Sequence, residues 1–398
     1  MVTPRWHFNE RRRGDKNREP IVGEFFATDV IRNPAEALTR EGIQNTLDAV
    51  CGGATARVRF YLSGADAALP AAIMTRYMRD GWPHFLAERN GLKDCPGENA
   101  PCPFLVLEDF GTTGLTGDTE QWEDRPGVKN SFYYFCRAEG QSGKGEQDRG
   151  RWGVGKTVFP RSSRLNTFYA FTVRDDDKRH LLLGQTVLRS HHVSDKYYTP
   201  DGYFGLHQND LSLPVEDAKM LEQFRQDFRL SRENEPGLSI VVPWCDEEIT
   251  FERLLDAVMR QYYYPILSGK LSVTVATPER EVVLDDTTLL DELRARPADL
   301  AGELIPLIEL TQWSNQQTPE SMTTLSLLTG QAALKWSAER LTDEQIAQMR
   351  VALEKGEHVA VRVPVTVREK KKPPQQSFFD VFLVRDGSND GGRSSFLL

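Results

Sequence analysis

Long apolar runs are absent from this sequence, and its first twenty residues are polar and basic rather than apolar. A membrane-spanning helix needs roughly 18 consecutive apolar residues, and a secretory signal needs an apolar stretch near its start. Because the sequence has neither, we expect a cytoplasmic protein with no membrane partner. The 398 residues are 39% hydrophobic and 27% charged, which is typical of a globular chain of two or three domains.

Cysteine and histidine are also scarce, with 5 and 7 residues respectively. The cysteines are odd in number and their spacings match no zinc-binding pattern, so we expect reduced thiols with a structural role. His191 and His192 are adjacent, but no further metal ligand stands at a recognisable spacing from them. We therefore expect both histidines to lie at the surface.

Positive charge does not predominate, because 49 basic residues face 58 acidic residues and the net charge is −9. This balance argues against a protein that is covered with basic charge for binding nucleic acid. Short basic clusters occur at residues 11–13 and 370–372, and such clusters are more often solvated patches than binding sites. A role for nucleic acid is left open.

The periodicity of apolar residues predicts an α+β protein. Asn33 and Pro34 begin a helix, since asparagine caps free N–H groups and proline suits the first helical turn. This helix is expected to run to about Val50, just before two glycines. Strands are predicted at residues 57–62, 104–107, 167–174, 180–188 and 238–244. These elements predict helices with a mixed, mostly antiparallel sheet.

The same elements divide the chain into an arm and two domains. Residues 1–20 look like an arm, residues 21–245 hold the first set of elements, and residues 246–398 hold the second. In the second set, we expect an amphipathic helix at residues 341–354 and strands at 358–367 and 378–384. Only a short tail follows the last strand, so we expect this domain to be truncated at its C-terminus or to lack a partner there.

A polar, glycine-rich stretch occupies residues 111–155, with one helix expected near residues 129–137. A stretch of this length inside a compact domain is usually functional, and it often forms a lid over a ligand. We therefore expect a lid in this part of the chain.

Three segments carry candidate chemistry, and the first lies on the predicted helix after Asn33. Glu41, Asn45 and Asp48 are spaced i, i+4 and i+7, so they share one helix face. A carboxylate and a carboxamide one turn apart offer oxygen ligands that suit Mg²⁺. The carboxylate is also able to orient a water for attack on a terminal phosphate. For this segment alone, an ordinary solvated face is the alternative.

The second segment follows the predicted strand at residues 104–107. Asp109 stands near the end of this strand, and Gly111 and Gly114 come soon after it. Glycines let the backbone approach a flat ligand, and a carboxylate accepts a hydrogen bond from an exocyclic amine such as that of adenine. For this segment alone, a strand followed by a tight turn is the alternative.

The third segment, residues 150–157, contains Gly153, Gly155 and Lys156. Backbone N–H groups of a glycine-rich loop before a helix bind phosphate. The segment also satisfies the P-loop pattern G-x-x-x-x-G-K-[ST], with Lys156 and Thr157 in its last two positions. A P-loop directly follows a buried strand, whereas the residues before this segment are polar. The P-loop is therefore an alternative without its structural context.

In this order, the segments resemble the GHKL ATPase superfamily, which includes gyrase-type ATPase domains, the large heat-shock chaperone, MutL and MORC proteins. The resemblance covers roughly residues 20–245 and is closest to the MORC, MutL and chaperone branches. Four stretches carry it: Glu41-x-x-Gln44-Asn45-x-x-Asp48-Ala49, Asp109-x-Gly111 with Gly114, Gly150-x-x-Gly153-x-Gly155-Lys156, and Gly237-Leu238-Ser239-Ile240.

The resemblance implies a Bergerat-type two-layer α/β sandwich with helices on one face of its sheet. It also implies that residues 246–398 are a transducer-like α/β domain. In that family a transducer lysine contacts the terminal phosphate. The candidates here are Lys335, Lys355, Lys370, Lys371 and Lys372, and the sequence does not choose among them.

Roles on the phosphate side of the expected pocket follow from the same resemblance. Glu41 would be the general base that positions water, Asn45 would bind Mg²⁺, and Asp48 would support the pocket one turn further on. Three residues of the third segment would close over the phosphates of ATP: Gly153, Gly155 and Lys156.

Roles on the adenine side follow in the same way. Asp109 would accept a hydrogen bond from the adenine amine, with Gly111 and Gly114 giving clearance. The second motif has one more residue between its glycines than the family pattern has. Ser239 would take the place of a family threonine near the adenine.

The expected function is Mg²⁺-dependent ATP hydrolysis that controls closure of the lid and pairing of two subunits into a homodimer. By family analogy, such an ATPase works in a bacterial DNA-related or anti-phage defence complex beside a nuclease- or helicase-type protein partner. Two alternatives remain: a P-loop NTPase that uses Lys156 and Thr157, and a non-catalytic scaffold with an ATPase fold.

Overall fold

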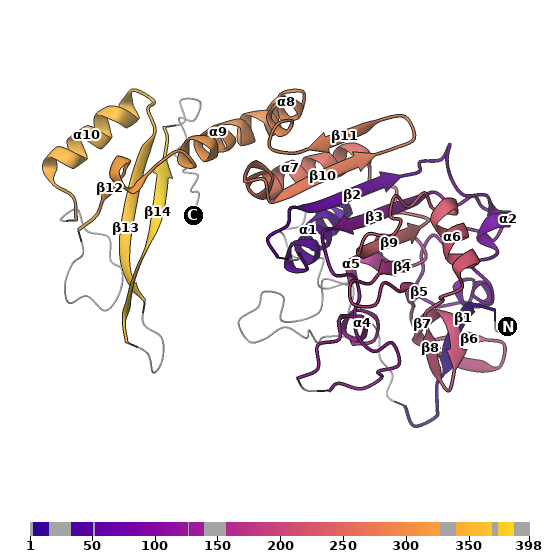
Figure 1. Cartoon of the computed structure of the whole chain (residues 1–398). Coiled ribbons are helices and arrows are strands. Elements are labelled where there is room, and N and C mark those ends of the chain that lie inside the picture. Colours follow the sequence, from indigo (N-terminus) through magenta and orange to yellow (C-terminus); the bar gives the residue numbers. More distant parts are fainter. Residues whose placement is uncertain are drawn as a thin grey trace. The chain divides into compact units, whose positions relative to one another are not determined.

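The computed structural model describes residues 3–15, 33–50, 52–125, 127–138, 157–326, 340–367 and 373–385 (Figure 1). The chain divides into two compact units, Met1–Leu289 and Leu290–Leu398. Each unit combines helices with its own sheet, so the predicted α+β class is confirmed.

A large mixed sheet forms the centre of the first unit. Its strands are β1 (Arg5–Glu10), β2 (Ala56–Leu62), β3 (Phe104–Phe110), β4 (Thr167–Val173), β5 (His180–Val187), β6 (His191–Val193), β7 (Lys196–Gln208), β8 (Leu211–Leu213), β9 (Gly237–Pro243), β10 (Leu271–Ala276) and β11 (Glu281–Leu284). The strand order is β1-β7-β5-β4-β9-β3-β2-β10-β11, with β6 and β8 paired to β7. Neighbouring strands of this described sheet run antiparallel, except that β10 runs parallel to β2.

Helices cover both faces of this sheet (Figure 1). They are α1 (Pro34–Asp48), α2 (Ala71–Met74), α3 (Trp82–Phe85), α4 (Ser131–Cys136), α5 (Val158–Arg161), α6 (Ala218–Asp227) and α7 (Phe251–Leu267). Successive side chains of a strand point to opposite faces, so Val106 and Leu107 of β3 mark the two sides. Leu107 lies against Gly42 of α1, whereas Val106 belongs to a core that includes α2, α3 and α6. The expected two-layer arrangement, with helices on one face only, is thus corrected.

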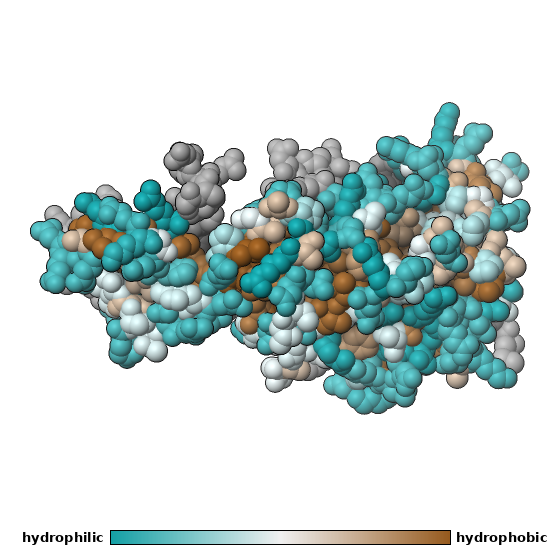
Figure 2. Space-filling view, turned by 90° about the horizontal axis from the view of Figure 1, so that it is seen from above, coloured by the Kyte–Doolittle hydropathy of each residue, from teal (hydrophilic) through white to brown (hydrophobic). Residues whose placement is uncertain are grey.

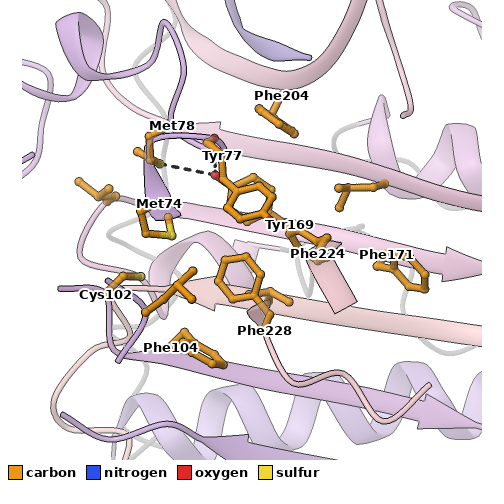
Figure 3. Close-up of a cluster of buried hydrophobic side chains, with 14 of the residues drawn as sticks. Met74, Tyr77, Met78, Cys102, Phe104, Tyr169, Phe171, Phe204, Phe224 and Phe228 are labelled. Atoms are coloured by element: carbon orange, nitrogen blue, oxygen red, sulfur yellow. Dashed lines mark hydrogen bonds between the residues drawn. The ribbon is translucent and has the colours of Figure 1, made fainter. Parts of the chain in front are cut away.

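An aromatic core explains why the second face is covered. Tyr169 of β4 packs edge-on against Phe224 of α6 at 5.7 Å between ring centroids, and Phe224 lies 4.7 Å from Phe228 (Figure 3). Such pairs contribute about 0.5–1.5 kcal/mol each beyond the burial of their area. The hydroxyl of Tyr169 donates to the carbonyl of Tyr77 at 2.8 Å, so the buried phenol is satisfied. These contacts fix α6 and the segment around α2 against the sheet.

The N-terminal residues also belong to this core. Arg5–Glu10 pairs with β7 as strand β1, and the side chains of Trp6 and Phe8 are buried. The indole N–H of Trp6 donates to the carbonyl of Tyr77 at 2.9 Å. The prediction of a free arm at residues 1–20 is therefore wrong for β1, because two of its large apolar side chains face the core.

The first helix matches its prediction closely. Asn33 caps α1 by accepting a 3.0 Å hydrogen bond from the amide of Glu36, and Pro34 is its first residue. The helix ends at Asp48, within two residues of the expected end. One helix face carries Leu38, Gly42, Ile43 and Thr46, which are all buried.

The boundary between the units lies further along the chain than the sequence predicts. We expected a second domain from residue 246, but α7 packs against α1, where the hydroxyl of Tyr262 donates to the carbonyl of Arg40 at 2.6 Å. Next, β10 adds to the sheet alongside β2. The first unit therefore continues to Leu289.

The described part of the predicted lid is a packed segment. Leu115, Phe132 and Cys136 pack against Leu181 and Leu183 of β5. The segment also contains Asn130, which is buried and caps α4. Residue 126 and residues 139–155 of the predicted lid lie outside the described residues.

The second unit has a smaller sheet with its own core. Its elements are α8 (Leu289–Arg294), which begins at the boundary, α9 (Ala298–Ser314), the 3-10 helix η3 (Pro319–Ser321), β12 (Thr323–Thr324), α10 (Asp343–Glu354), β13 (Val359–Val367) and β14 (Gln375–Leu383). The strand order is β12-β13-β14. Leu325, Val361 and Val363 form a core on which Met349 and Leu353 of α10 pack. The helix and the two long strands predicted here are confirmed.

Hydrophilic side chains cover most of the face shown in Figure 2, with smaller hydrophobic areas between them. No helix among the described residues is both long and apolar enough to cross a membrane. The cysteines at positions 95, 102, 136 and 245 are free thiols, and all but Cys95 are buried, in line with a structural role.

Candidate functional site

The candidate site begins on the side of α1 that flanks its buried face. Asn45 and Asp48 are exposed, and the side chain of Glu41 is 23% exposed. Oε1 of Glu41 lies 3.3 Å from Nε of Arg40. No described residue forms a hydrogen bond with the carboxamide of Asn45. Glu41 and Asn45 are thus one turn apart on a rigid helix, with their polar ends accessible.

Close packing holds α1 against β3, the strand that carries Asp109 near its end. A Cβ atom built on Gly42 would lie 2.6 Å from Cδ2 of Leu107, so the helix backbone lies directly on this side chain of β3. Beyond the helix, Val50 and Thr112 form an isolated antiparallel bridge. These two contacts bring the first and second sequence segments together, although they are more than sixty residues apart in the chain.

Asp109 is a mostly buried carboxylate whose two oxygens differ in their hydrogen bonds. Its Oδ1 accepts hydrogen bonds from the amide of Leu238 at 2.7 Å and from the hydroxyl of Thr112 at 2.8 Å. Its Oδ2 accepts no hydrogen bond from the described residues, and the side chain is 14% exposed. Burial raises the pKa of Asp109, while the positive charge of Arg232 and these hydrogen bonds oppose the rise. One oxygen is therefore anchored and the other is left to accept a donor.

Directly before Asp109, Glu108 is fully buried on the opposite face of the sheet. Arg59 donates to it from Nη1 at 3.0 Å, and Ser231 donates from its amide at 2.9 Å and its hydroxyl at 2.6 Å. The amide of Arg232 and the hydroxyl of Ser239 complete the set at 3.1 and 3.0 Å. A buried carboxylate with this many donors is well satisfied.

Ser239 belongs to this network rather than to the face of Asp109. It stands opposite Glu108 in the register of β9 and β3, and it accepts a 2.9 Å hydrogen bond from Nε of Arg232. The position that contacts Asp109 directly is Leu238, through its main-chain amide. Ser239 was predicted near the adenine. Its hydroxyl contacts Glu108 and Arg232, on the face of the sheet opposite to the side chain of Asp109.

The two glycines after Asp109 adopt conformations that favour glycine. Gly111 has φ +80° and Gly114 has φ +67°. A Cβ atom on Gly114 would collide with the carbonyl oxygen of Val173 and would lie 2.7 Å from the hydroxyl of Thr172. The clearance at Gly114 therefore serves the close approach of this loop to β4. On Gly111, a Cβ atom would lie 3.1 Å from the carbonyl of Thr55.

The third segment falls almost entirely outside the described residues. Gly153, Gly155 and Lys156 are among residues 139–156, and the described chain resumes at Thr157, directly before α5. α5 packs against α1. The chain therefore returns beside the helix that carries Glu41 and Asn45.

Of the transducer lysine candidates, Lys335, Lys370, Lys371 and Lys372 also lie outside the described residues. Lys355 is exposed at the C-terminal cap of α10 in the second unit. Across the described ranges, no group of three or more histidine, cysteine, aspartate or glutamate side chains is arranged to hold a metal ion.

The histidine pair differs from its prediction. His192 is exposed, but His191 is buried, with Nε2 at 2.9 Å from Nδ1 of His84 and Nδ1 at 2.8 Å from the carbonyl of Arg189. Both ring nitrogens of His191 are engaged within the protein. Its role is therefore structural, and the expectation of a surface position is wrong for this residue.

Glu108 and Arg232 are polar residues that sequence reasoning missed. The sequence did contain a signal for the burial of Glu108, because this residue directly continues the apolar run of β3, within a strand that is buried. A charged residue at such a position needs buried partners. Comparison with protein-family models and with curated proteins finds no match for this chain.

Proposed function

We propose that the first unit binds ATP with Mg²⁺ and hydrolyses it, in the manner of the GHKL ATPases that its motifs resemble. The observation that carries this proposal is the anchored carboxylate of Asp109, which keeps Oδ2 without a described donor at the end of β3. The Gly42–Leu107 packing holds α1, with Glu41 and Asn45, against this same strand.

In this proposal, Asp109 accepts a hydrogen bond from the amino group of adenine. Asn45 provides an oxygen ligand to Mg²⁺, whose remaining ligands are phosphate oxygens and water, as this ion prefers. Glu41 orients a water toward the terminal phosphate and accepts its proton. Asp48 supports the site from the next turn of α1.

The phosphate contacts are assigned to Gly153, Gly155 and Lys156 on the strength of the sequence pattern. The return of the chain beside α1 at Thr157 supports this assignment. A Bergerat-type sandwich accounts for α1, α5 and α7 on one face of a mixed sheet. The helices and aromatic core on the other face would be additions to that two-layer fold.

Closure of the predicted lid, residues 111–155, and nucleotide-driven pairing of two subunits are part of the same proposal, on the basis of the sequence pattern alone. Segments rich in glycine and polar residues suit a switch that phosphate contacts order and release. A nuclease- or helicase-type partner, and a role in anti-phage defence, are proposed from family analogy alone.

The described fold gives little support to the P-loop alternative. A P-loop lies between a strand of a parallel sheet and a full helix. Here the helix after Lys156 and Thr157 is α5, which has only 4 residues. The described sheet is antiparallel except where β10 meets β2. The ATPase-fold scaffold remains the second candidate, and only a turnover assay separates it from an enzyme.

The proposal is tested by binding and turnover measured on one preparation of the full chain. ATP should bind in the presence of Mg²⁺ and be hydrolysed, and a non-hydrolysable analogue should shift the protein to a dimer in size-exclusion chromatography. Repeating the run with DNA reports on nucleic-acid dependence. Absence of ATP binding at millimolar nucleotide would contradict the proposal, and binding without turnover would favour the scaffold.

A further inference from the structure

The carboxylate of Asp109 is connected to a buried charge network on the far side of the sheet. Glu108 and Arg232 are both fully buried, and they come from β3 and from the loop between α6 and β9. The main-chain amides of Ser231 and Arg232 both donate to Glu108. These hydrogen bonds fix the loop, and with it the start of β9, on the strand that carries Asp109.

The guanidinium group of Arg232 joins the ends of β3 and β9. Its Nη2 donates to the carbonyl oxygen of Leu238 at 3.0 Å and also to the carbonyl oxygen of Asp109. The same nitrogen lies 3.7 Å from Oδ1 of Asp109. The guanidinium carbon stands 4.5 Å from the ring centre of Phe110, whose face supports the plane of the group. The arginine therefore contacts both residues of the Leu238–Asp109 hydrogen bond.

We propose that Arg232 and Glu108 are positioning residues for Asp109, which hold its Oδ1 on the amide of Leu238 so that Oδ2 points to the amino group of a purine. This inference rests on the proposed role of Asp109 in reading adenine. Neither residue touches the nucleotide. Arg232 acts through Leu238 and Asp109, and Glu108 acts by holding the loop that carries Arg232.

A purely structural role explains this arrangement less well. Buried ion pairs are often replaceable by apolar side chains without loss of stability, because removing two charges from water is costly. Nη2 of Arg232 donates to the two main-chain carbonyls beside one carboxylate, while Nη1 donates to the carbonyl of Glu235. This planar set of donors fixes orientation in a way that an apolar residue cannot. Among the described residues, the charged groups that act on Asp109 are Arg232 and Glu108: the negative charge of Glu108 raises the pKa of Asp109, whereas the positive charge of Arg232 lowers it and favours the ionised form that accepts a hydrogen bond.

The test compares ATP with inosine triphosphate, which carries an oxygen in place of the adenine amino group. Wild-type protein should bind ATP at least about tenfold more tightly, since a charge-assisted hydrogen bond is lost with inosine triphosphate. Arg232→Met should bring the ratio of the ATP and inosine triphosphate affinities close to one. It should also raise the pH below which ATP affinity falls, because the ionised form of Asp109 loses a neighbouring positive charge. Arg232→Lys keeps the positive charge but not the planar set of donors. It should therefore restore the wild-type pH dependence of ATP affinity and only part of the preference for ATP over inosine triphosphate.

A core variant on the same face, Phe228→Leu, serves as a control for lost stability. It should lower the melting temperature and leave the ratio of the two affinities unchanged. If Arg232→Met does not fold, the double variant Glu108→Gln/Arg232→Met removes both charges together and should show the same loss of discrimination.

A second measurement is independent of nucleotide. Hydrogen exchange of the Leu238 amide should accelerate about tenfold or more in the Arg232 variants relative to the Ile240 amide, because the bond to Oδ1 loosens. Wild-type discrimination and wild-type exchange in the Arg232 variants would overturn the positioning role. If the wild type binds neither nucleotide, the proposed function fails and the purine-reading part of the inference fails with it, while the exchange rates still decide whether Arg232 holds Asp109.

Discussion

Gly42 of α1 lies directly on the side chain of Leu107 of β3, and there is no room for a side chain at position 42. Asp109 follows two residues later, one residue before the strand ends at Phe110, and the helix carries Glu41 on one side of Gly42. Since helices and strands are rigid over such short spans, this contact fixes how the two acidic residues are presented. In the function we propose, one Mg²⁺-bound ATP would use both, with its adenine at Asp109 and its terminal phosphate at Glu41.

Replacing Asp109 by asparagine should weaken ATP binding while leaving the fold intact. The Oδ1 of asparagine still accepts from Leu238 and Thr112, but an N–H donor then replaces the accepting Oδ2. Two donors would face each other at the adenine amine, so we expect a loss of about 1.5–3 kcal/mol in ATP affinity. Inosine triphosphate should bind the variant more tightly than it binds the wild type, because its carbonyl oxygen accepts from the new N–H donor. Calorimetric titration measures both, with Asp118→Asn as the control in an exposed acid of the same loop.

Glu41→Ala should bind ATP with Mg²⁺ but fail to hydrolyse it. A positioned general base contributes about 10²- to 10⁴-fold in rate, so turnover should fall by at least 100-fold while affinity stays within about threefold. The matched control is Glu36→Ala, which changes the same residue type in the first turn of the same helix. Loss of binding in Glu41→Ala, or unchanged turnover, would remove Glu41 from the role of base.

Gly114→Ala should be far more destabilising than an alanine at another glycine with the same backbone conformation. Gly64 has φ +62° with nothing within 4 Å of a built Cβ atom, whereas Gly114 has φ +67° and faces the carbonyl of Val173. Strain alone should cost Gly64→Ala about 1 kcal/mol. The added collision should bring the cost at Gly114 to roughly 3–5 kcal/mol.

Urea unfolding of the two variants gives both free energies. Equal costs would mean that the loop after Asp109 shifts to accommodate the methyl group, and the close approach to β4 would then not be needed. A large cost at Gly114 would explain this glycine by packing alone, without any ligand.

Local signals in the sequence were enough to predict α1. Its cap at Asn33, its proline and its apolar face all act within a few residues, and the observed ends agree with the prediction. The shared face of Glu41, Asn45 and Asp48 follows from the same helical geometry. Such features depend on chemistry that a short window of sequence contains.

Long-range pairing was beyond the same reasoning. The boundary near Cys245 was wrong because β10 pairs with β2. A short window of sequence does not show which strand a later strand will pair with. The second covered face escaped prediction since the run between β2 and β3 contains only short helices. The burial of Glu108 also escaped prediction, because the donors that satisfy it include the amide of Arg232, which is over one hundred residues away in the sequence.

Acid should destabilise the first unit partly through His84. The His84 ring stacks on Phe8 at 3.9 Å between ring centroids. Because Nδ1 of His191 faces a carbonyl oxygen, it carries the proton, and Nε2 of His191 accepts from Nδ1 of His84. Burial, with smaller contributions from His191 and His7, lowers the pKa of His84 from 6.5 to about 4.

The sign of the effect follows from proton binding. Between pH 6.5 and about pH 4, the unfolded chain protonates this histidine while the folded protein keeps it neutral, so stability falls as the pH falls through this window. His84 is only partly buried, and solvent screening reduces its contribution to the loss of stability. We therefore expect His84 to account for about 1–2 kcal/mol of that loss. His84→Gln cannot titrate, so its free energy of unfolding should fall less steeply from pH 6.5 to pH 4. Phe228→Leu, which lowers stability without removing a titrating group, should keep the wild-type slope, and a wild-type slope in His84→Gln would rule out a neutral buried His84.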